Sequence, residues 1–463
     1  MARGNWQGMT LAIYDTASRA VKEIQSQNGV TSMYCCGPTV YRDAHVGNLR
    51  TFLLSDLIRR VIEVTGGKVE LVQNITDVGH MSVDVIGEDK LLAQATAENK
   101  DPFEIARVYE SKFHKDLALL NVMKADNYPR ASESIDLMIA MIADLVSKNF
   151  AYVGNDGSVY FDSKAFASYG NISGNRLEAL KPGHRYEYSD ESGKRFHADW
   201  ALWKTAAERT QMIWDSPWGF GFPGWHIECS AMSMRLLRNH VNVHVGGIDL
   251  RFPHHENERA QSNAATGTET VDLWVHGEHL LFEGRKMSKS AGNVVLLSDV
   301  VSRGLDPLST RLCFLENRYR SQMDLTWSAL EIADAQLDKW RRKTALWGDS
   351  TEFKVDHDFL EAFEYDLDTP RALQRLRSIE KSHEISDSEK RAIFIYADKV
   401  LGLDLTRPVI VREISKEQQE MLEARFLARS EKRWSDSDAL RLALEKSGLE
   451  IKDGASGQEW IWR

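Results

Sequence analysis

Four side chains of metal-binding type stand out in the sequence, although they are scattered along the chain. Cys36 closes a short apolar run, and Cys229 lies in "GWHIECSAM". His254 and Glu258 are four residues apart in "FPHHENERAQ", where Pro253 would begin a helix. Side chains at i and i+4 point from one face of a helix, a spacing typical of metal ligands. A metal site built from these residues would have to be closed by the fold.

The spacing leaves two choices open. Cys35 and Cys36 are adjacent, as are His254 and His255, so either member of each pair could be the ligand. Two buried cysteines beside a polar helix face would give the same pattern without a metal. The four cysteines, at 35, 36, 229 and 313, are too few and too scattered for a disulfide framework.

A second group is "HVGN", His45–Asn48, at the turn between the same apolar run and a helical one. Gly47 would let a ligand approach the backbone. His45 and Asn48 would add side-chain donors near a helix N-terminus, where the dipole favours phosphate. Taken alone, these four residues are explained more simply by a capped helix start.

The third group is "KMSKS", residues 286–290, between Gly284 and Gly292. Its two lysines, Lys286 and Lys289, and its two hydroxyl groups could close over a polyphosphate. There they would stabilise the charge that develops on a leaving pyrophosphate. A solvated basic loop is the alternative interpretation.

The elements that must position these groups begin as an α/β protein. Residues 32–41 have the pattern of a short strand, 48–66 have helical spacing, and 68–77 are again extended. This order predicts a βαβ unit. Strand-like runs return at 242–249 and 273–282, after a stretch that has the composition of an insertion.

Beyond about residue 325 the sequence is charged, amphipathic and helical, most clearly at 369–384 and 416–448. The 463 residues, of which 43% are apolar, suffice for two or three globular domains. No run has the length of a membrane span or a signal-peptide core, so we expect a cytoplasmic protein without a membrane partner. The net charge of -10 argues against indiscriminate nucleic-acid binding but not against a local basic face.

Together and in this order, the three groups resemble the motifs of class I aminoacyl-tRNA synthetases, and their details resemble the cysteinyl-tRNA synthetase family. The resemblance covers nearly the whole chain, and the combination is far more specific than any single motif. The blocks that carry it are "YCCGPTVYRDAHVGN", "NITDVGH", "GWHIECSAM", "GGIDLRFPHHENERAQ", "GRKMSKSAGN", "YDLDTPRAL" and "WSDSDALRLALEKSGLEIKDG".

The resemblance implies one zinc ion per chain and identifies its ligands. Thiolate binds zinc far better than hydroxyl does, so substrate cysteine would be separated from serine at the metal. Cys35 would be packed beside the site. The implied zinc ligands are Cys36, Cys229, His254 and Glu258; the cysteine-binding residues are Thr39, Thr76 and Trp225; and the ATP-binding residues are Gly47, Gly247, Asp249 and Lys289.

The implied reaction activates L-cysteine with ATP and transfers it to the 3′ end of tRNA(Cys). Mg²⁺ is expected on the ATP phosphates. The resemblance gives the main catalytic roles to His45 and Lys289, with Asn48 and Lys286 in support. Catalysis would then consist mostly of positioning and electrostatic stabilisation.

The implied fold is α/β. A Rossmann-like parallel-sheet catalytic domain, split by an insertion, would be followed by an all-α C-terminal region with a small tail domain, and we expect a monomer. The expected boundaries are 1–125 for the first catalytic half, 126–200 for the connective insertion, 201–300 for the second half with the zinc site and KMSKS loop, 301–345 for a stem-contact region, and 346–463 for a helical tRNA- and anticodon-binding region.

Three positions depart from the family's most familiar pattern. Asn48 stands where the signature has histidine, and an amide can donate a similar hydrogen bond but carries no charge. "VGHM" follows "NITD" where acidic and basic residues are common. Arg251 precedes "FPHHENE" where an apolar residue is frequent.

Two other classes of protein share parts of the pattern. A non-ribosomal cysteine ligase of the mycothiol-pathway type, which joins cysteine to an amino sugar, would keep all three motifs but lacks the family's tail. A catalytically silent RNA-binding paralogue should have lost ligands or the mobile lysine. The tail "GLEIKDGASGQEWIWR" therefore favours the tRNA enzyme. Contacts to tRNA are expected from "ENRYRSQ" and "KWRRKTALW", although solvated helix faces have the same composition.

Overall fold

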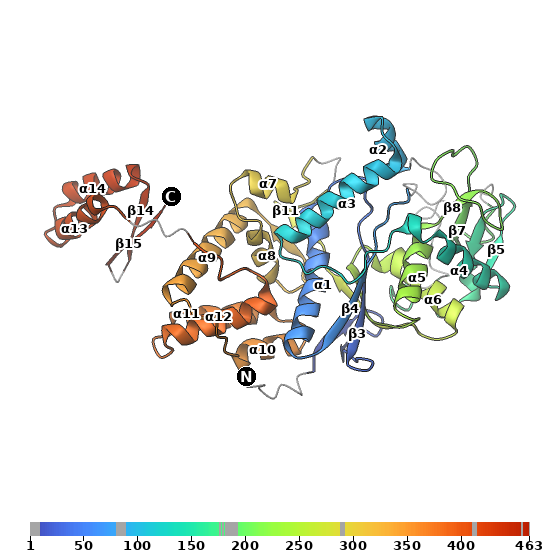
Figure 1. Cartoon of the computed structure of the whole chain (residues 1–463), viewed down its shortest axis with the longest axis horizontal. Helices are drawn as coiled ribbons and strands as arrows, with labels where there is room; N and C mark the ends of the chain where they lie inside the picture. The colour runs from blue at the N-terminus through green and yellow to red at the C-terminus, as the bar shows by residue number, and fades with distance from the viewer. Residues whose placement is uncertain are drawn as a thin grey trace. The chain divides into compact units, whose positions relative to one another are not determined.

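The computed structural model divides the chain into two compact units, Met1–Arg407 and Pro408–Arg463. Figure 1 shows the elements of each unit. Among the described residues, no helix is both long enough and apolar enough to cross a membrane. The structure describes residues 10–79, 89–175, 177, 180, 193–287, 292–409, 414–454 and 457–462.

The first unit is built on a four-stranded parallel sheet. The chain leaves β3 toward β4 on one side and returns to β9 on the other, so the strand order reverses between β3 and β9. In a parallel sheet, such a switch point opens a crevice outside the carboxyl ends of the strands. In spatial order the strands are β10 (Val271–Gly277), β9 (Val241–Gly247), β3 (Val30–Cys35) and β4 (Lys68–Gln73).

Helix α1 (Val46–Val64) packs on this sheet and joins β3 to β4. Its Leu49 and Ile58 lie in one buried core with Met33 of β3 and Val243 of β9. The apolar residues recur at helical spacing in α1 and run almost without a break through the strands, as in a sheet covered on both faces. The predicted βαβ opening is confirmed.

The stretch between β4 and β9 contains helices and an antiparallel sheet of order β5-β6-β7-β8. Phe161 of β6 stacks on the fully buried Trp200 of β7 with ring centroids 4.4 Å apart, in a core separate from that of the parallel sheet. Its elements are α2 (Lys90–Glu98), α3 (Pro102–Leu119), the 3₁₀ turns η1 (Ala131–Glu133) and η2 (Ser163–Ala165), α4 (Ile135–Ser147), β5 (Ala151–Val153), β6 (Val159–Phe161), β7 (Trp200–Thr205), β8 (Gly221–Pro223) and α5 (Trp225–Leu236). The antiparallel sheet and α4 form a lobe beside the parallel sheet, whereas Leu91 of α2 and Phe113 of α3 lie in the core of the parallel sheet (Figure 1).

Two small sheets flank the main one. A hairpin of β1 (Ala12–Asp15) and β2 (Ala20–Glu23) lies near β10, since the Thr16 N–H donates to the Trp274 carbonyl at 2.9 Å. Beyond β10, β11 (Leu280–Phe282) pairs antiparallel with β12 (Arg285–Lys286) and parallel with β13 (Met323–Leu325). The strand-like run predicted at 273–282 is thus two strands, β10 and β11.

The helices that follow share the core of the parallel sheet rather than forming a core of their own. Leu312 of α8, Leu337 of α9 and Phe394 of α12 lie in the same buried cluster as Leu49 of α1. Figure 1 shows α8, α9, α11 and α12 grouped beside α1. These helices are α7 (Leu297–Ser302), α8 (Leu308–Leu315), α9 (Trp327–Leu346), α10 (His357–Glu364), α11 (Thr369–Lys381) and α12 (Asp387–Leu401).

A buried ion pair ties this helical part to α1. Arg311 of α8 donates to Asp56 of α1 at 2.5 Å, and both side chains are almost fully buried. Arg311 also donates to the carbonyls of Leu120 and Leu401. Burial raises the pKa of Asp56, but Arg311 and Arg60 outweigh it, so the pKa lies below its usual value and the carboxylate stays ionised.

The second unit is a small helical and β-hairpin domain with α13 (Lys416–Ser430), α14 (Trp434–Lys446), β14 (Leu449–Gly454) and β15 (Gly457–Trp462). Its core contains Leu422, Leu444 and Ile451. Arg425, which is 1% exposed, donates to both carboxylate oxygens of Asp453 at 2.9 Å. A bidentate pair of this kind joins α13 to the hairpin.

The Asp56–Arg311 pair predicts a difference between buried and exposed ion pairs. Asp56→Asn should lower the free energy of unfolding by about 3–5 kcal/mol, because it leaves a buried guanidinium without its counter-charge. Glu70→Gln breaks the exposed pair with Arg238, whose side chain is 73% exposed, and should cost less than about 1 kcal/mol. Urea unfolding followed by circular dichroism compares them. Equal losses would show that the buried pair does not hold the two parts together.

Candidate active site and metal centre

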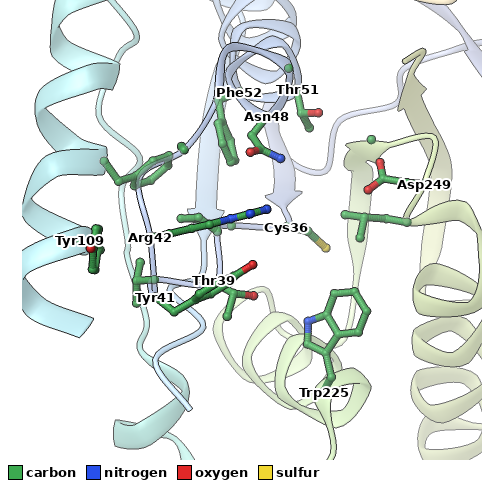
Figure 2. Close-up of a pocket in the computed structure, with 18 of the residues that line it drawn as sticks. Cys36, Thr39, Tyr41, Arg42, Asn48, Thr51, Phe52, Tyr109, Trp225 and Asp249 are labelled. Atoms are coloured by element: carbon green, nitrogen blue, oxygen red, sulfur yellow. The ribbon is translucent and has the colours of Figure 1, made fainter. Parts of the chain in front are cut away.

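The main cavity lies at the switch point of the parallel sheet and has a volume of about 670 Å³. Its wall comes from residues 36–44 after β3, the first turns of α1 and α5, and residues after β9. Figure 2 shows Cys36, Trp225 and Asp249 around the same open space. The cavity therefore brings together residues from the first two groups predicted to carry chemistry.

The predicted metal ligands Cys36, Cys229, His254 and Glu258 meet beside this cavity. One ligating atom from each lies within 4.8 Å of the other three. Cys36 follows β3 and Cys229 lies in α5, whereas His254 belongs to a π-helical turn, η4 (Arg251–His255), that leads into α6 (Glu256–Thr266). Nε2 of His254 lies 2.9 Å from Oε1 of Glu258, as expected for residues at i and i+4.

A second set of four donors shares Cys36 and Glu258 but is completed by His244 and His255. Sγ of Cys36 lies 3.4 Å from Nε2 of His244 and 3.3 Å from Nε2 of His255. This set has one thiol, whereas the first has two, and thiolates favour zinc.

Access to the cavity also distinguishes the two sets. None of His244, His254 and His255 lines the cavity itself, but His254 follows Pro253 and stacks on Trp225, and both of these neighbours line it. A metal that meets a substrate needs an open coordination position. The set with Cys229 and His254 is therefore the better fit.

Burial leaves the first set in need of a cation. None of its four side chains is more than 4% exposed. Burial raises the pKa of the Cys36 thiol and of the Glu258 carboxyl well above their usual values, whereas a hydrogen bond with Cys36 lowers the pKa of Cys229. Oε2 of Glu258 is buried without a hydrogen-bond partner among the described residues. Two thiols, an imidazole and a carboxylate match the ligands of zinc, which would displace their protons.

Neighbouring aromatic rings orient His254. Trp225 stacks on it with ring centroids 4.1 Å apart and an interplanar angle of 25°. On the other side, Nδ1 of His226 lies 2.8 Å from Nδ1 of His254. Partners of this kind fix the ring orientation of a metal-binding histidine.

The "HVGN" turn is both a capped helix start and part of the cavity wall. Nδ1 of His45, the N-cap of α1, accepts from the Asn48 N–H at 3.2 Å, and Oδ1 of Asn48 accepts from the His45 N–H at 3.3 Å. Burial and the nearby Arg42 lower the pKa of His45, so the ring is neutral near pH 7 with its proton on Nε2. The amide nitrogen of Asn48 is not needed for the cap, and Asn48 lines the cavity.

Gly47 brings the "HVGN" and "KMSKS" segments into contact. A Cβ atom at Gly47 would lie 2.8 Å from Cε of Met287 and 3.1 Å from the ring of His45. After the loop, Leu296 forms a β-bridge with His45. The described residues before and after the KMSKS loop are therefore both held beside the start of α1.

Of the two KMSKS lysines, the structure describes only Lys286. Lys286 ends β12, where its side chain is exposed and its carbonyl accepts from Asn293 at 3.1 Å. Lys289 lies outside the described residues, which omit 288–291. Its catalytic role stays a prediction.

The predicted cysteine-binding residues do not all reach the cavity. Thr39 and Trp225 line it, whereas Thr76 is 1% exposed and is not among the lining residues. Thr76 instead forms a parallel bridge with Thr39, and its hydroxyl accepts from the Asn74 side chain at 3.1 Å. Its place is behind Thr39, where it fixes the loop after β3.

The predicted adenosine-binding residues follow β9. Gly247 and Asp249 both line the cavity. A Cβ atom at Gly247 would lie 2.4 Å from Oδ1 of Asp249 and 3.4 Å from the hydroxyl of Thr51. Only glycine lets the Asp249 carboxylate fold back over the strand end toward α1.

Comparison with known proteins supports the same assignment. Residues 22–335 match the tRNA synthetases class I (C) catalytic domain, and residues 411–460 match the cysteinyl-tRNA ligase anticodon binding domain. The chain is 41% identical to cysteine–tRNA ligase 1 of Burkholderia lata, over 97% of this chain and 96% of that protein. The chain belongs to the cysteine–tRNA ligase family.

A second member of this family, the cysteine–tRNA ligase of Thermus thermophilus, is 39% identical over 98% of this chain and 99% of that protein. Among solved structures, methionyl-tRNA synthetase of Mycobacterium tuberculosis with methionyl-adenylate superposes with a TM-score of 0.55 at 14% identity, covering 85% of this chain and 94% of that one. This last likeness shows the fold alone. The class I α/β fold implied by the sequence is confirmed.

Sequence reasoning missed the histidines that surround the thiols of this ligase-family site. Besides His226, these are His244 in "VHVGGID" and His276 in "WVHGEHL"; His255 was already considered as the alternative to His254. Nδ1 of His255 lies 2.9 Å from Nε2 of His276, and Nδ1 of His276 lies 2.8 Å from the Thr16 hydroxyl. The missed histidines lie in separate motifs far apart in the sequence, and spacing alone cannot connect them.

The basic residues predicted to contact tRNA are largely paired within the chain. In "ENRYRSQ", Arg318 pairs with Asp368 and Arg320 with Asp366. In "KWRRKTALW" the pairs are Lys339 and Lys343 with Glu380, Arg341 with Asp306, and Arg342 with Asp338. These segments therefore present less free positive charge than their sequences indicate.

Metal analysis can decide between the two donor sets, because Cys229 belongs to only one. Cys229→Ser should lose most of the zinc that the purified wild-type chain carries, since it removes a thiolate ligand. Cys35→Ser is the matched control: Cys35 is buried, its sulfur accepts from Gln73 at 3.8 Å, and it belongs to neither donor set, so zinc should be retained. A full zinc equivalent in Cys229→Ser would move the site to His244 and His255.

Proposed function

We propose that this chain joins L-cysteine to the 3′ end of tRNA(Cys) in two steps. The cysteine carboxylate attacks the α-phosphate of ATP, which gives cysteinyl-adenylate and pyrophosphate. The acyl group then passes to the terminal ribose of tRNA. The observation that carries this proposal is the single cavity that joins a buried two-thiol donor set to a helix N-terminus and to Asp249.

Cysteine is selected at the metal in this proposal, with one zinc held by the set that contains Cys229 and His254. When bound there, zinc supplies a position that prefers thiolate to hydroxyl. A pocket that measures only size separates such close analogues by about 10- to 200-fold. Trp225 and Thr39, on the cavity wall beside the donors, would hold the remainder of the amino acid.

The ATP phosphates are bound at the start of α1. The neutral His45 can donate from Nε2, and Asn48 from its amide, next to the free N–H groups of the first helical turn. Lys286 and Lys289 would stabilise the pyrophosphate as it leaves, acting from a loop held against this turn.

The nucleoside lies near Gly247 and Asp249. The carboxylate of Asp249 can accept from ribose hydroxyl groups, and the missing side chain at Gly247 leaves room for that approach. ATP thus spans from β9 to the start of α1 across the switch point of the sheet. This is the place where open α/β sheets bind their ligands.

The second unit binds the anticodon end of tRNA in this proposal, and its match to an anticodon binding domain supports the role. The part that meets the acceptor stem is the predicted region 301–345, and the predicted region 346–463 supplies the remaining tRNA contacts. The protein acts as a monomer in the cytoplasm.

A cysteine ligase that acts on an amino sugar is the nearest rival. It would use the same cavity and motifs, but it has no need of an anticodon-binding unit. The folded second unit, with its own core and its bidentate Arg425–Asp453 pair, therefore favours tRNA as the acceptor.

The choice of acceptor gives a direct test. The intact chain should charge tRNA(Cys) transcripts with cysteine and should leave an amino-sugar acceptor unmodified. A chain ended after Arg407, at the boundary between the units, should keep cysteine-dependent pyrophosphate exchange but lose most tRNA charging, because lost positioning costs rate far from the chemistry. Circular dichroism confirms that the shorter chain is folded. Undiminished charging by this fragment would remove the main argument for tRNA as the acceptor.

A further test concerns the KMSKS loop. Lys289→Ala should slow pyrophosphate exchange by about 100-fold or more while zinc content and cysteine binding stay unchanged, because its charge acts mainly in the transition state. Lys432→Ala is a matched control in the second unit, distant in sequence from every site residue. Near-normal exchange by Lys289→Ala would refute the assigned role.

A further inference from the structure

A second cavity, of about 290 Å³, lies beside the active site. The short segment after β9 separates the two: Gly247, Asp249 and Leu250 line the main cavity, whereas Ile248 and Arg251 line the second. The hairpin of β1 and β2, the turn at residues 172–173 and the end of β10 complete its wall. The proposed function assigns it no role.

Two arginines on this wall are not engaged within the described residues. Neither Arg19 nor Arg251 has a side-chain hydrogen bond or an ion pair there, and Nε of Arg251 is buried without a hydrogen-bond partner. Arg19 lies over the turn at Gly174, where a Cβ atom would come within 2.3 Å of its guanidinium. Arg251 is also the residue that stands where the family frequently has an apolar one.

The other side chains on this wall that can carry a charge near neutral pH are Arg320, His276 and Glu278, and together with the two arginines they set the net charge of the cavity. Arg320 pairs with Asp366, and burial and the nearby Arg251 lower the pKa of His276 to about 3, so His276 is neutral. Glu278 is the remaining carboxylate on the wall; one of its oxygens accepts from the His279 N–H at 2.9 Å, and its charge also acts on Arg50, which does not line the cavity. Two guanidinium groups against one carboxylate leave a net charge of +1.

We infer that this cavity binds one nucleotide unit of the tRNA backbone, with the phosphodiester on Arg19 and Arg251 and a ribose 2′-hydroxyl donating to Glu278. A net charge of +1 matches the single charge of a phosphodiester better than that of a free phosphate dianion. An acceptor for a 2′-hydroxyl is a feature of RNA recognition. The hydroxyl group of Tyr14 on the same wall suits a further backbone contact.

The inference rests on the proposed function, since it needs tRNA as the partner. It also explains how an acidic chain can meet RNA although the basic segments at 316–322 and 339–347 are largely paired internally. Arg320 of the first segment lies on the wall of this cavity, so the nucleotide would be bound next to the region predicted to contact the acceptor stem.

Salt-dependent binding of tRNA(Cys) tests the inference. Arg251→Leu should weaken binding by about tenfold, as for the loss of one charge-assisted hydrogen bond. It should also reduce the slope of log K against log salt by about 0.7–0.9, the value for one phosphate contact. Arg19→Gln should act in the same direction, and because its side chain is exposed, folding is not at risk. Arg251→Lys, which keeps the charge, should restore most of the slope.

Arg235→Leu is the matched control, because Arg235 is an exposed arginine at the end of α5 that also has no side-chain partner among the described residues. Equal losses in Arg235→Leu and Arg251→Leu would overturn the inference in favour of a diffuse charge effect. Calorimetry with inorganic phosphate tests whether the cavity binds a free anion instead of the tRNA backbone. If Arg251→Leu lost phosphate binding but kept wild-type tRNA affinity, the cavity would serve a free anion and not RNA.

Pyrophosphate exchange separates this inference from the proposed function. Arg251→Leu should keep cysteine-dependent exchange near the wild-type rate, which also shows that it is folded. Loss of exchange would overturn the inference by placing Arg251 in the active site. If the wild-type chain itself neither exchanged nor charged tRNA, the proposed function would fail, whereas unchanged tRNA binding by Arg251→Leu in an active enzyme would refute the cavity assignment alone.

Discussion

The cost of burying two thiols, an imidazole and a carboxylate in one place is the constraint on which the catalytic half depends. Burial raises the pKa of Cys36 and Glu258, and Oε2 of Glu258 has no hydrogen-bond partner among the described residues, so a cation among the donors would offset the cost of burying them. Three separate segments must deliver them. The parallel sheet does so because Cys36 directly follows β3, while α5 leads into β9 and η4 follows that strand. The same crossing of segments creates the cavity at the switch point.

The second constraint is the contact between the start of α1 and the KMSKS segment. Gly47 is required because any side chain there would meet both Met287 and the ring of His45. A residue that caps a helix cannot move without unwinding its first turn, so the cap holds His45 and Asn48 in place. A fixed turn at this place suits the proposed reaction, in which the phosphates must be held in one position during the chemistry.

Sequence reasoning found the motifs and the βαβ opening because these are local. The i, i+4 spacing of His254 and Glu258 and the helical period of α1 are encoded within a few residues. It could not rank His254 against His255, since both lie on one short turn, and only the position of Trp225 and the cavity separates them. Nor could it foresee that Thr76 lies behind Thr39, because a bridge between distant loops leaves no spacing to detect. The run at 273–282 seemed to be one strand because a bend after Gly277 does not interrupt its apolar pattern.

Charge pairing in three dimensions explains why composition misleads about RNA contact. The basic segments 316–322 and 339–347 pack beside aspartate and glutamate side chains. Their positive charges are therefore largely neutralised by ion pairs within the chain. An arginine without an ion pair is better evidence of a binding site, because no acidic side chain among the described residues neutralises its charge. Since exposed ion pairs contribute little stability, an exposed arginine without an ion pair, such as Arg19, costs the fold little and remains available to a ligand. The acidic net charge and RNA binding are therefore compatible, provided that the few unpaired cations stand where the nucleic acid passes.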